Sequence, residues 1–353
     1  MKINNLARHC NSKKYDIEYF YHNQNVKHFT TIPKTSDLDL HWIFKKYLCE
    51  VRDYKIAESY ITKLDGVKIQ VYNKLGSCKL FTKYNELIES ESTNYRQRDL
   101  DFNEELKLSG LSFCLLSDSS SVFFHWIYQS LPRINLLNKS KYFLDDIENF
   151  IVPEDCQSNL HISTLKKLGI SEEKILKTKP GQLIECESMV ISSLPTKNIY
   201  VSSWVYNFIK TNFFSGINKR FRKIYISREK ASCRKILNED EVFSFLKKMG
   251  FKKIYIEDYS LEDQAQIFNG AEEIVTPHGS SLANLVFCRP RTKVLEFFNP
   301  NYVMPLYWSI SNDLDLDYAY LIGEGKRPKE GEDPHKGKEN ILLNLEKLKK
   351  YFN

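Results

Sequence analysis

Hydrophobic and polar positions are most regularly spaced in the segment 222–300. Short apolar runs there predict four strands, at 223–226, 253–256, 273–276 and 293–298. Between the strands, apolar residues three and four positions apart predict helices that begin after the capping residues Asn238 and Ser260. Because strands and helices alternate strictly, we expect a parallel sheet with helical crossovers, which is a Rossmann-like domain.

The first two hundred residues give a less regular pattern. Apolar positions separated by turn residues predict β structure over 55–90. Helical spacing over 121–137 is interrupted by Pro132, which lacks a backbone donor, so we expect this helix to bend or split. A short buried strand is predicted at 150–153 and a helix over 158–168.

The length of the chain bounds its organisation. Its 353 residues exceed the size at which a single core usually stops growing, so we expect two domains, over 1–200 and 201–338. Segment 323–340 is rich in glycine, proline and charged residues and is predicted to be a solvated loop. The remaining segment, 339–353, is predicted to form a helix with one apolar face, and such a helix needs a surface on which to pack.

Composition narrows the class of protein. Hydrophobic residues make up 42% of the chain and charged residues 27%, which excludes a disordered or fibrous protein. The formal net charge of +6 is spread along the sequence, so we expect no nucleic-acid partner. Eight scattered cysteines without a C-x-x-C pair predict neither a metal site nor a disulfide framework. With no long apolar run and no signal-peptide pattern, we expect a cytoplasmic protein with at most peripheral contact at the inner face of the membrane.

Polar residues that suit a nucleotide follow or lie on three of the predicted strands. They are Ser227, Arg228 and Arg234 after the first strand, His278, Gly279, Ser280 and Ser281 after the third, and Glu296 on the fourth. Open parallel sheets bind ligands at the carboxyl ends of their strands. A glycine at a helix start exposes backbone amides to an anion, arginines add forked donors to phosphate oxygens, and a carboxylate suits a ribose. This segment therefore predicts a nucleoside diphosphate site, for which surface ion pairs and a plain turn are the alternative interpretation.

His125 is a candidate general base. The segment Phe123-Phe124-His125-Trp126 places it among aromatic residues, where a loop is predicted to become a helix. A neutral imidazole, with an ordinary pKa of about 6.5, can take a proton from a hydroxyl group. Arg133, which follows in the Leu131-Pro132-Arg133 segment, is a second candidate catalytic residue. A histidine that is hydrogen-bonded within the core would fit the same pattern.

These blocks, in this order, resemble glycosyltransferase family 61 over roughly residues 110–300. Members of the family show an aromatic-His-Trp segment before Leu-Pro-Arg, a helix that ends in Leu-Gly-Ile, a strand followed by Ser-Arg and a later Leu-Asn-Glu, and Pro-His-Gly-x-x-Leu-x-Asn. The corresponding segments here are 124–133, 168–170, 224–239 and 277–284. The family includes bacterial enzymes of capsular polysaccharide biosynthesis and eukaryotic O-linked GlcNAc and xylose transferases.

The resemblance implies an α/β protein of the GT-B class, with two Rossmann-like domains facing a cleft. Residues 1–200 would then be an acceptor-side domain with a β-rich entry segment, and residues 201–338 the nucleotide-sugar domain. The C-terminal helix over 339–353 would cross back to the first domain. The residues implied to bind the donor are Ser227, Arg228, Arg234, His278, Gly279, Ser280, Ser281, Asn284 and Glu296, and those implied to act in catalysis are His125 and Arg133.

The resemblance also implies the reaction. An inverting, metal-independent transferase would move a sugar from a nucleotide sugar, in particular a UDP-sugar, to a hydroxyl of a glycan or glycolipid acceptor. No cofactor would be needed beyond this donor substrate, and the product would serve capsule or surface polysaccharide synthesis. Asp315-Leu316-Asp317 has the spelling of a metal-binding Asp-x-Asp motif, but it lies past the Rossmann strands, so we interpret it as surface.

Two positions depart from the family pattern. Members often carry Asp four residues after the motif histidine, whereas this chain has Gln129, which cannot act as a base, so Asp118 is the alternative base to His125. Ser281 stands where the family has a second glycine, which we expect to narrow or reshape the phosphate cradle. Gln129 also leaves open a catalytically inactive nucleotide-sugar-binding or scaffold protein. A NAD-dependent oxidoreductase is disfavoured because no G-x-G-x-x-G follows a strand.

Overall fold

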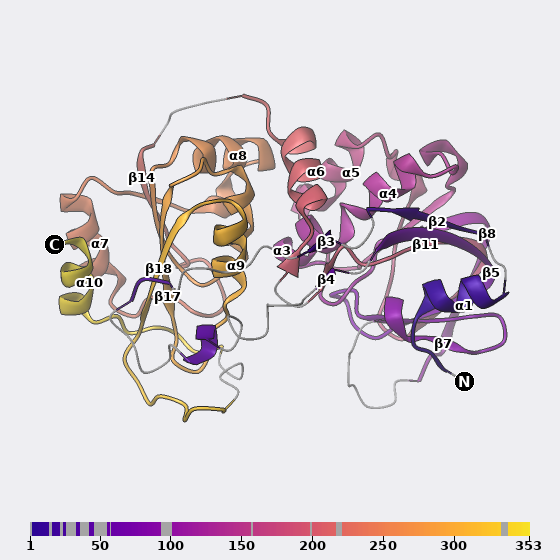
Figure 1. The fold of residues 1–353 in the computed structure, drawn as a ribbon, viewed down its shortest axis with the longest axis horizontal. Helices are drawn as coiled ribbons and strands as arrows, with labels where there is room; N and C mark the ends of the chain where they lie inside the picture. The colour runs from indigo at the N-terminus through magenta and orange to yellow at the C-terminus, as the bar shows by residue number, and fades with distance from the viewer. Residues whose placement is uncertain are drawn as a thin grey trace. The chain divides into compact units, whose positions relative to one another are not determined.

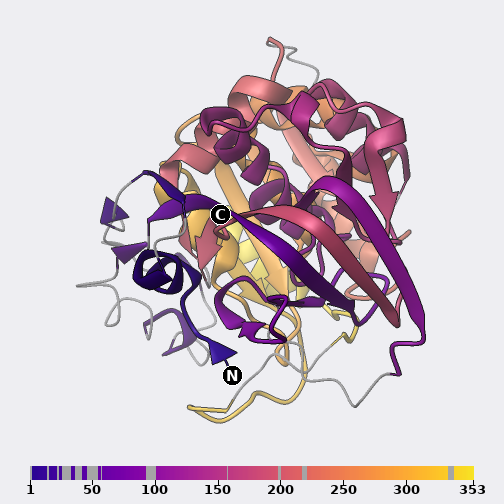
Figure 2. The same cartoon turned by 90° about the vertical axis from the view of Figure 1, so that its right-hand side faces the viewer.

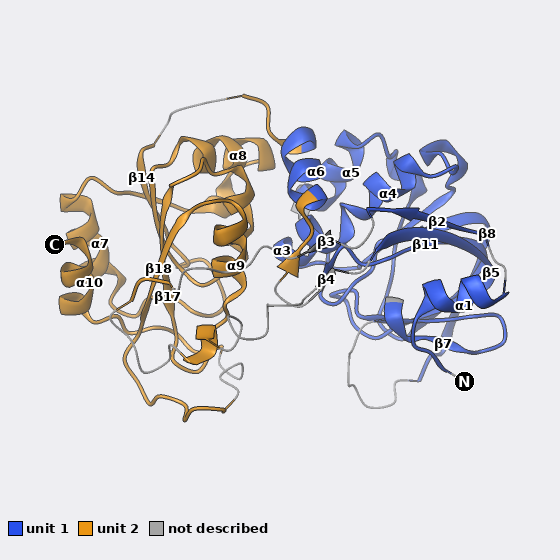
Figure 3. Cartoon of the chain, in the orientation of Figure 1, with its two compact units in different colours: residues 1–24, 56–197, 204–212 blue, residues 25–55, 198–203, 213–353 orange. Residues whose placement is uncertain are grey.

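In a computed structural model, the chain divides into two compact units (Figure 3). The structure describes residues 2–13, 16–21, 24–25, 33–35, 42–45, 55–56, 58–92, 101–156, 158–197, 200–216, 221–332 and 338–353. Unit 1 comprises 1–24, 56–197 and 204–212, and unit 2 comprises 25–55, 198–203 and 213–353. Each unit is therefore built from three separate segments of the chain, whereas a single boundary was expected near residue 200.

Unit 1 is built on a mixed nine-stranded sheet whose central pair, β5 (Ser59–Val71) and β11 (Gln182–Ser192), is antiparallel (Figure 1). Beyond β11 the sheet continues with parallel strands, β8 (Glu104–Cys114), β9 (Asn149–Val152) and β10 (Ile175–Lys177). Beyond β5 it continues with β6 (Cys78–Phe81), β7 (Leu87–Ile88) and β1 (Lys2–Ile3), and β2 (Ile17–Phe20) also pairs with β5. Parallel pairing therefore runs only from β11 to β10 on this side, and the sheet as a whole is mixed, unlike the parallel sheet expected of a Rossmann-like N-terminal domain. From β11 across β5 and β6 to β7 the neighbours are antiparallel, since a short turn, rather than a helical crossover, joins β5 to β6. The edge strand β1 pairs with β7 in parallel.

The two long strands of unit 1 curve along their length. Figure 2 shows β5 in purple and β11 in pink bending together. A register irregularity falls between Cys186 and Ser188 of β11, and Gly66 of β5 has a φ of 67°, which only glycine adopts readily. An apolar cluster of this sheet includes Ile69, Cys114 and Met189.

The predicted interruption by Pro132 is confirmed. The helical segment consists of α3 (Phe123–His125), the π-helical turn η4 (Trp126–Ser130) and α4 (Arg133–Lys139). Leu131 N donates to Trp126 O at 2.9 Å, a five-residue step, and Pro132 has no N–H with which to continue the ladder. The other helices over this part of the chain are α1 (Leu6–Lys13), α5 (Ser158–Lys167) and α6 (Ser203–Phe213).

Unit 2 contains the parallel sheet that the sequence predicts. The strand order is β15 (Lys252–Ile254), β14 (Lys223–Ile226), β16 (Glu273–Pro277), β17 (Lys293–Phe298) and β18 (Asp317–Ile322), and every neighbouring pair is parallel. The first four are the predicted strands, and β18 is an edge strand that the sequence analysis did not identify. Short strand pairs elsewhere join β3 (Gln24–Asn25) to β4 (Lys55–Ile56) and β12 (Thr196–Lys197) to β13 (Tyr200–Val201).

Helices cover both faces of the unit 2 sheet. Figure 1 shows α7 (Glu239–Lys248) and α10 (Leu345–Phe352) on one face, and α8 (Leu261–Gly270) and α9 (Leu306–Asp313) on the other. The 3₁₀ helix η8 (Ser280–Phe287) follows β16 directly and packs with α8 and α9. Ser260 caps α8 as predicted, because its hydroxyl accepts a hydrogen bond from Asp263 N at 3.1 Å.

The C-terminal helix packs within unit 2, which corrects the expectation that it crosses back to the N-terminal domain. Leu348 is fully buried in the apolar cluster formed by α7 and one face of the sheet. The ring of Phe352 lies 6.0 Å from Phe245 and 5.7 Å from Phe251, between centroids. The apolar face of α10 is therefore covered by α7 and by Phe251, which lies between α7 and β15, all within unit 2. Of the predicted loop over 323–340, residues 333–337 lie outside the described residues.

Candidate functional site

In unit 2, the segments after β14 and β16 bring two arginines to one turn. β14 and β16 are parallel neighbours, so their carboxyl ends lie at the same edge of the sheet. Arg234 Nε donates to the backbone oxygen of His278 at 3.1 Å. The guanidinium of Arg228 lies against Gly279, where a Cβ would stand 2.0 Å from Arg228 NH1. The structure thus places Arg228, Arg234, His278 and Gly279 together, as the sequence predicts.

The two guanidinium groups form a cluster of positive charge. Burial lowers the pKa of Arg228, and the nearby Arg234 lowers it further. Arg228 NH2 donates to Cys233 O at 3.1 Å, whereas its Nε is buried without a hydrogen-bond partner. Neither guanidinium forms an ion pair with a carboxylate of the described residues. A buried cationic group with an unused donor favours an anionic ligand.

The start of η8 adds backbone and hydroxyl donors beside this cluster. Gly279 is extended, and the first helical hydrogen bond is donated by Leu282 N to Gly279 O at 3.1 Å. The amides of Ser280 and Ser281 precede that bond and are therefore the free amides of the helix start. The Ser281 hydroxyl is buried and has no hydrogen-bond partner in the structure. Ser227 shapes the neighbouring turn, since its hydroxyl accepts a hydrogen bond from Glu229 N at 3.1 Å.

Glu296 does not lie where a ribose could reach it, and this corrects the role expected for it. Its side chain is fully buried, and both carboxylate oxygens are engaged. His278 Nδ1 donates to one oxygen and the Tyr318 hydroxyl to the other, each at 2.5 Å. Burial, with Glu296 nearby, raises the pKa of Tyr318 well above its usual value, so Tyr318 remains a donor. Glu296 therefore orients His278 from behind the turn.

Aromatic rings enclose His278. The ring centroids of Phe298, Tyr302 and Tyr307 lie 5.2, 5.3 and 5.4 Å from that of His278. Burial lowers the pKa of His278 against the opposing effect of Glu296. The Arg234 guanidinium lies 4.9 Å from the centroid of the Tyr302 ring. The sequence does not reveal these tyrosines, because they follow β17 at irregular spacing and belong to no motif.

Asn284 also differs from the role expected for it. It is fully buried within η8, and its Nδ2 donates to Gln264 Oε1 at 2.8 Å and to Ser281 O at 3.1 Å. Asn284 therefore links η8 to α8 and supports the donor turn from inside, rather than presenting its side chain to a ligand.

In unit 1, the turn before β6 supports the loop that leads to His125. Ser121 N donates to Leu75 O at 3.0 Å, and the Ser77 hydroxyl donates to Asp118 Oδ1 at 3.2 Å. Gly76 has a φ of 101°, and a Cβ there would lie 2.1 Å from the Ser120 hydroxyl, so this close approach requires glycine. The loop that carries Asp118 is thus held by a backbone and a side-chain hydrogen bond from the turn between β5 and β6.

His125 is half-buried at the end of α3. Its Nδ1 lies 2.8 Å from Gln129 Oε1, and Gln129 Nε2 donates to the Thr196 hydroxyl at 3.0 Å. Burial lowers the pKa of His125, while the hydrogen bond to Gln129 and the charge of Asp118 act in the opposite direction. The ring is nearly perpendicular to that of Phe124, at 83°, with centroids 5.3 Å apart. The arrangement favours a neutral imidazole at neutral pH, the form that a base requires.

Arg133 is buried and holds backbone elements together. Its Nε donates to the Ser192 hydroxyl at 2.8 Å, and its NH1 donates to Leu116 O at 2.9 Å. These contacts join α4 to the end of β11 and to the segment after β8. No hydrogen bond among the described residues connects Arg133 to His125. The geometry gives Arg133 a supporting place in unit 1, and its catalytic role stays a prediction.

Neither a metal-binding cluster nor a bilayer-spanning helix is found within the described ranges. No group of three or more His, Cys, Asp or Glu side chains there is arranged to hold a metal ion. Asp315 is exposed, as expected, and Asp317 pairs with Lys34 at 2.9 Å. Seven cysteines of this part are free. None of the helices formed by these residues combines the length and apolar character needed to cross a bilayer.

Part of the chain matches a known protein family. The model of the family described as Glycosyltransferase 61 matches residues 123–295. The match begins at α3, two residues before His125, and ends inside β17, one residue before Glu296. It therefore includes the candidate base and the arginine–glycine turn. No curated protein matches the chain. The match makes residues 123–295 a glycosyltransferase family 61 domain and the protein a glycosyltransferase.

Proposed function

We propose that this glycosyltransferase transfers a sugar from a nucleoside diphosphate sugar, in particular a UDP-sugar, to a hydroxyl of a glycan or glycolipid. The observation that carries the proposal is the pair of guanidinium groups at the Gly279 turn, which have no carboxylate counter-charge among the described residues. Such a cluster suits the diphosphate of the donor. The GT-B arrangement of two domains, implied by the resemblance, stays a prediction.

The proposed role of this cluster is to stabilise the leaving group. As the bond between the anomeric carbon and the diphosphate breaks, the departing oxygen takes the electron pair and negative charge grows on the diphosphate. Arg228, Arg234 and the Ser280 and Ser281 amides would receive that charge. Because guanidinium groups and amides can supply the positive charge, we propose a reaction without a catalytic metal ion. Fixed donors of this kind each contribute about 2.7–4 kcal/mol in comparable sites.

The proposed base is His125. Its Nε2 would take the proton of the acceptor hydroxyl while the oxygen attacks the anomeric carbon from the side opposite the diphosphate. A single displacement of this kind inverts the anomeric centre. Support comes from the half-buried position of His125 and from the lowered pKa, which keeps the ring unprotonated near neutral pH. We further propose, from the family resemblance, a role in capsule or surface polysaccharide synthesis in the cytoplasm or at the inner face of the membrane.

Ligand-dependent thermal stability tests the donor site. We expect UDP and UDP-sugars to raise the melting temperature of the wild-type protein more than UMP does, with or without EDTA, because binding stabilises the folded state. Arg228→Ala and Arg234→Ala should abolish most of this rise.

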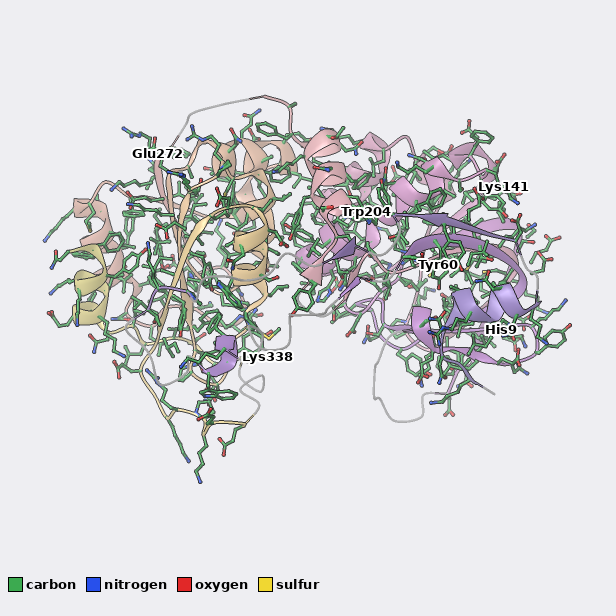
Figure 4. The ribbon with its side chains drawn as sticks, in the orientation of Figure 1. His9, Tyr60, Lys141, Trp204, Glu272 and Lys338 are labelled. Carbon is green, nitrogen blue, oxygen red and sulfur yellow. The ribbon has the colours of Figure 1, made fainter. Side chains whose placement is uncertain are left out.

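Arg222→Ala is the matched control, because Arg222 lies in the same unit but is exposed and paired with Glu272, labelled in Figure 4. It should respond to UDP as the wild type does. Equal responses from all three variants would contradict the proposed site.

A further inference from the structure

A chain of hydrogen bonds in unit 1 ends on the ring of His125. Thr196 lies in the short strand β12 and is buried, and its hydroxyl accepts a hydrogen bond from Gln129 Nε2 at 3.0 Å. The other end of the same amide, Oε1, lies 2.8 Å from His125 Nδ1. Gln129 lies on the π-helical turn that follows His125, four residues along the chain. One amide therefore bridges a fixed strand residue and the candidate base.

The chemistry of the amide decides which ring nitrogen carries the proton. With Nε2 directed to Thr196, the atom that faces His125 is a carbonyl oxygen, which can only accept a hydrogen bond. Nδ1 of the neutral ring must therefore carry the hydrogen. The lone pair then lies on Nε2, for which no described residue provides a hydrogen-bond partner.

We propose that Gln129, held by Thr196, is a positioning residue that keeps His125 in the Nδ1–H tautomer and so makes Nε2 the proton acceptor. The proposal rests on the proposed role of His125 as the base. When Nε2 takes the hydroxyl proton, the ring becomes an imidazolium whose Nδ1–H still donates to Gln129 Oε1. Gln129 itself neither gains nor loses a proton in this step.

A neutral amide has a second consequence, which concerns pH. Among the described residues, the groups that act on the His125 ring are Gln129, the charge of Asp118 and the ring of Phe124. A carboxylate at position 129 would add a negative charge next to Nδ1 and would stabilise the imidazolium. Gln129 orients the ring as a carboxylate would, but leaves the imidazole easier to deprotonate. The base should therefore stay active at lower pH than with an acidic residue at this position.

Nitrogen NMR of the full-length protein, labelled with ¹⁵N-histidine and without ligand, tests the proposal directly. Assignment comes from the signal that His125→Asn removes. Above its pKa, wild-type His125 should show a protonated Nδ1 and an unprotonated Nε2. Gln129→Ala and Thr196→Val should give a mixture of tautomers, whereas Thr196→Ser, which keeps the hydroxyl, should preserve the wild-type signal.

Gln129→Glu separates positioning from a merely structural effect. It should keep the Nδ1–H tautomer and raise the pKa of His125 by about one to two units in the NMR titration. The acid limb of UDP release from UDP-N-acetylglucosamine or UDP-xylose, with water as acceptor, should move to higher pH with it. Gln129→Ala should lower this turnover by about 10- to 100-fold, as loss of an orienting hydrogen bond does elsewhere.

An Nε2–H tautomer of His125 in the wild type would overturn the inference whatever the activity. So would an Nδ1–H tautomer that persists unchanged in Gln129→Ala. If instead the tautomer responds as expected but His125→Asn retains full turnover, the proposed base is wrong and the positioning is still shown.

Discussion

The guanidinium of Arg228 lies so close to Gly279 that a Cβ at that position would stand 2.0 Å from NH1 and 2.9 Å from Cζ. Gly279 is in an extended conformation that any residue can adopt, so the backbone does not require glycine here. The absence of a side chain at position 279 instead makes room for the arginine. A substitution of Gly279 therefore tests the proposed donor site.

Gly279→Ala should weaken UDP binding without unfolding the protein. The methyl group would displace the flexible end of Arg228 and not the backbone, so we expect the melting temperature of the free protein to change little. Loss of a charged hydrogen bond to phosphate costs about 1.5–3 kcal/mol, which corresponds to roughly a 10- to 100-fold rise in Kd. Titration calorimetry with UDP measures this change.

A double-mutant cycle provides the control for that experiment. In an Arg228→Ala background, Gly279→Ala should have almost no further effect on UDP affinity, because the group that it displaces is already gone. Additive losses in the double variant would show that position 279 acts independently of Arg228.

The pH dependence of turnover tests His125. Burial lowers the pKa of His125 below its ordinary 6.5. A base works only when unprotonated, so activity is present above this pKa and is lost as the pH falls through it. We expect kcat/KM to hold at pH 6.5 and to decline only at more acid pH.

In the His125→Ala variant this decline of kcat/KM at acid pH should be absent. Its kcat should be about 10²- to 10⁴-fold lower than that of the wild type, with the Kd for UDP unchanged. An acid limb that survives in the variant would direct attention to Asp118 as the base.

Glu296→Gln distinguishes an orienting role from contact with the ribose. The buried carboxylate accepts from both His278 and Tyr318, whereas an amide offers one acceptor and one donor. One of the two donors would lose its partner, so we expect the free energy of unfolding to fall by about 1–3 kcal/mol in a denaturant titration.

The preference for UDP over 2′-deoxy-UDP, however, should stay at its wild-type value. If Glu296 bound the ribose, this preference would disappear in the variant while the stability changed little.

Arg133→Met should act mainly on stability. The substitution removes the hydrogen bonds to Ser192 and Leu116 O from a buried position, and we expect unfolding to become easier by about 2–4 kcal/mol. Lys139→Met, on the same helix but with its ammonium over the Tyr21 ring at 5.0 Å, is the milder control.

Thermal unfolding and turnover per folded molecule separate the two possible roles of Arg133. A loss of kcat in Arg133→Met without a loss of stability would restore its catalytic role.

The stacking of Tyr21 on Trp204 is a contact that local sequence patterns do not predict. Tyr21 stacks on Trp204, labelled in Figure 4, with centroids 4.8 Å apart and planes 5° apart, although 183 positions separate them in the chain. Nothing in either local sequence indicates this pairing. In the same way β8 and β11, the longest parallel neighbours of unit 1, were not predicted. Leu106 and Leu108 of β8 alternate with polar residues, but the alternation changes phase after Gly110 and continues with Leu111 and Phe113.

The sequence by itself determined the elements and motifs that depend on neighbouring residues. The strands and helices over 222–300, the interruption at Pro132 and the cap at Ser260 each follow from local periodicity or from the chemistry of one side chain. The meeting of Arg228 and Arg234 at the Gly279 turn was also predictable, because the ends of parallel strands share one edge of the sheet.

Only the tertiary structure decided which side chains and elements contact one another across the chain. Glu296 meets Tyr318 because β17 pairs with β18, a strand that local patterns did not reveal, and this pairing directs the carboxylate inward. The contact of Gln129 with Thr196 and the packing of α10 on α7 likewise join segments that are distant in the chain. Contacts between distant segments depend on strand order, on register and on the apolar surface that must be buried. A short stretch of sequence determines none of these.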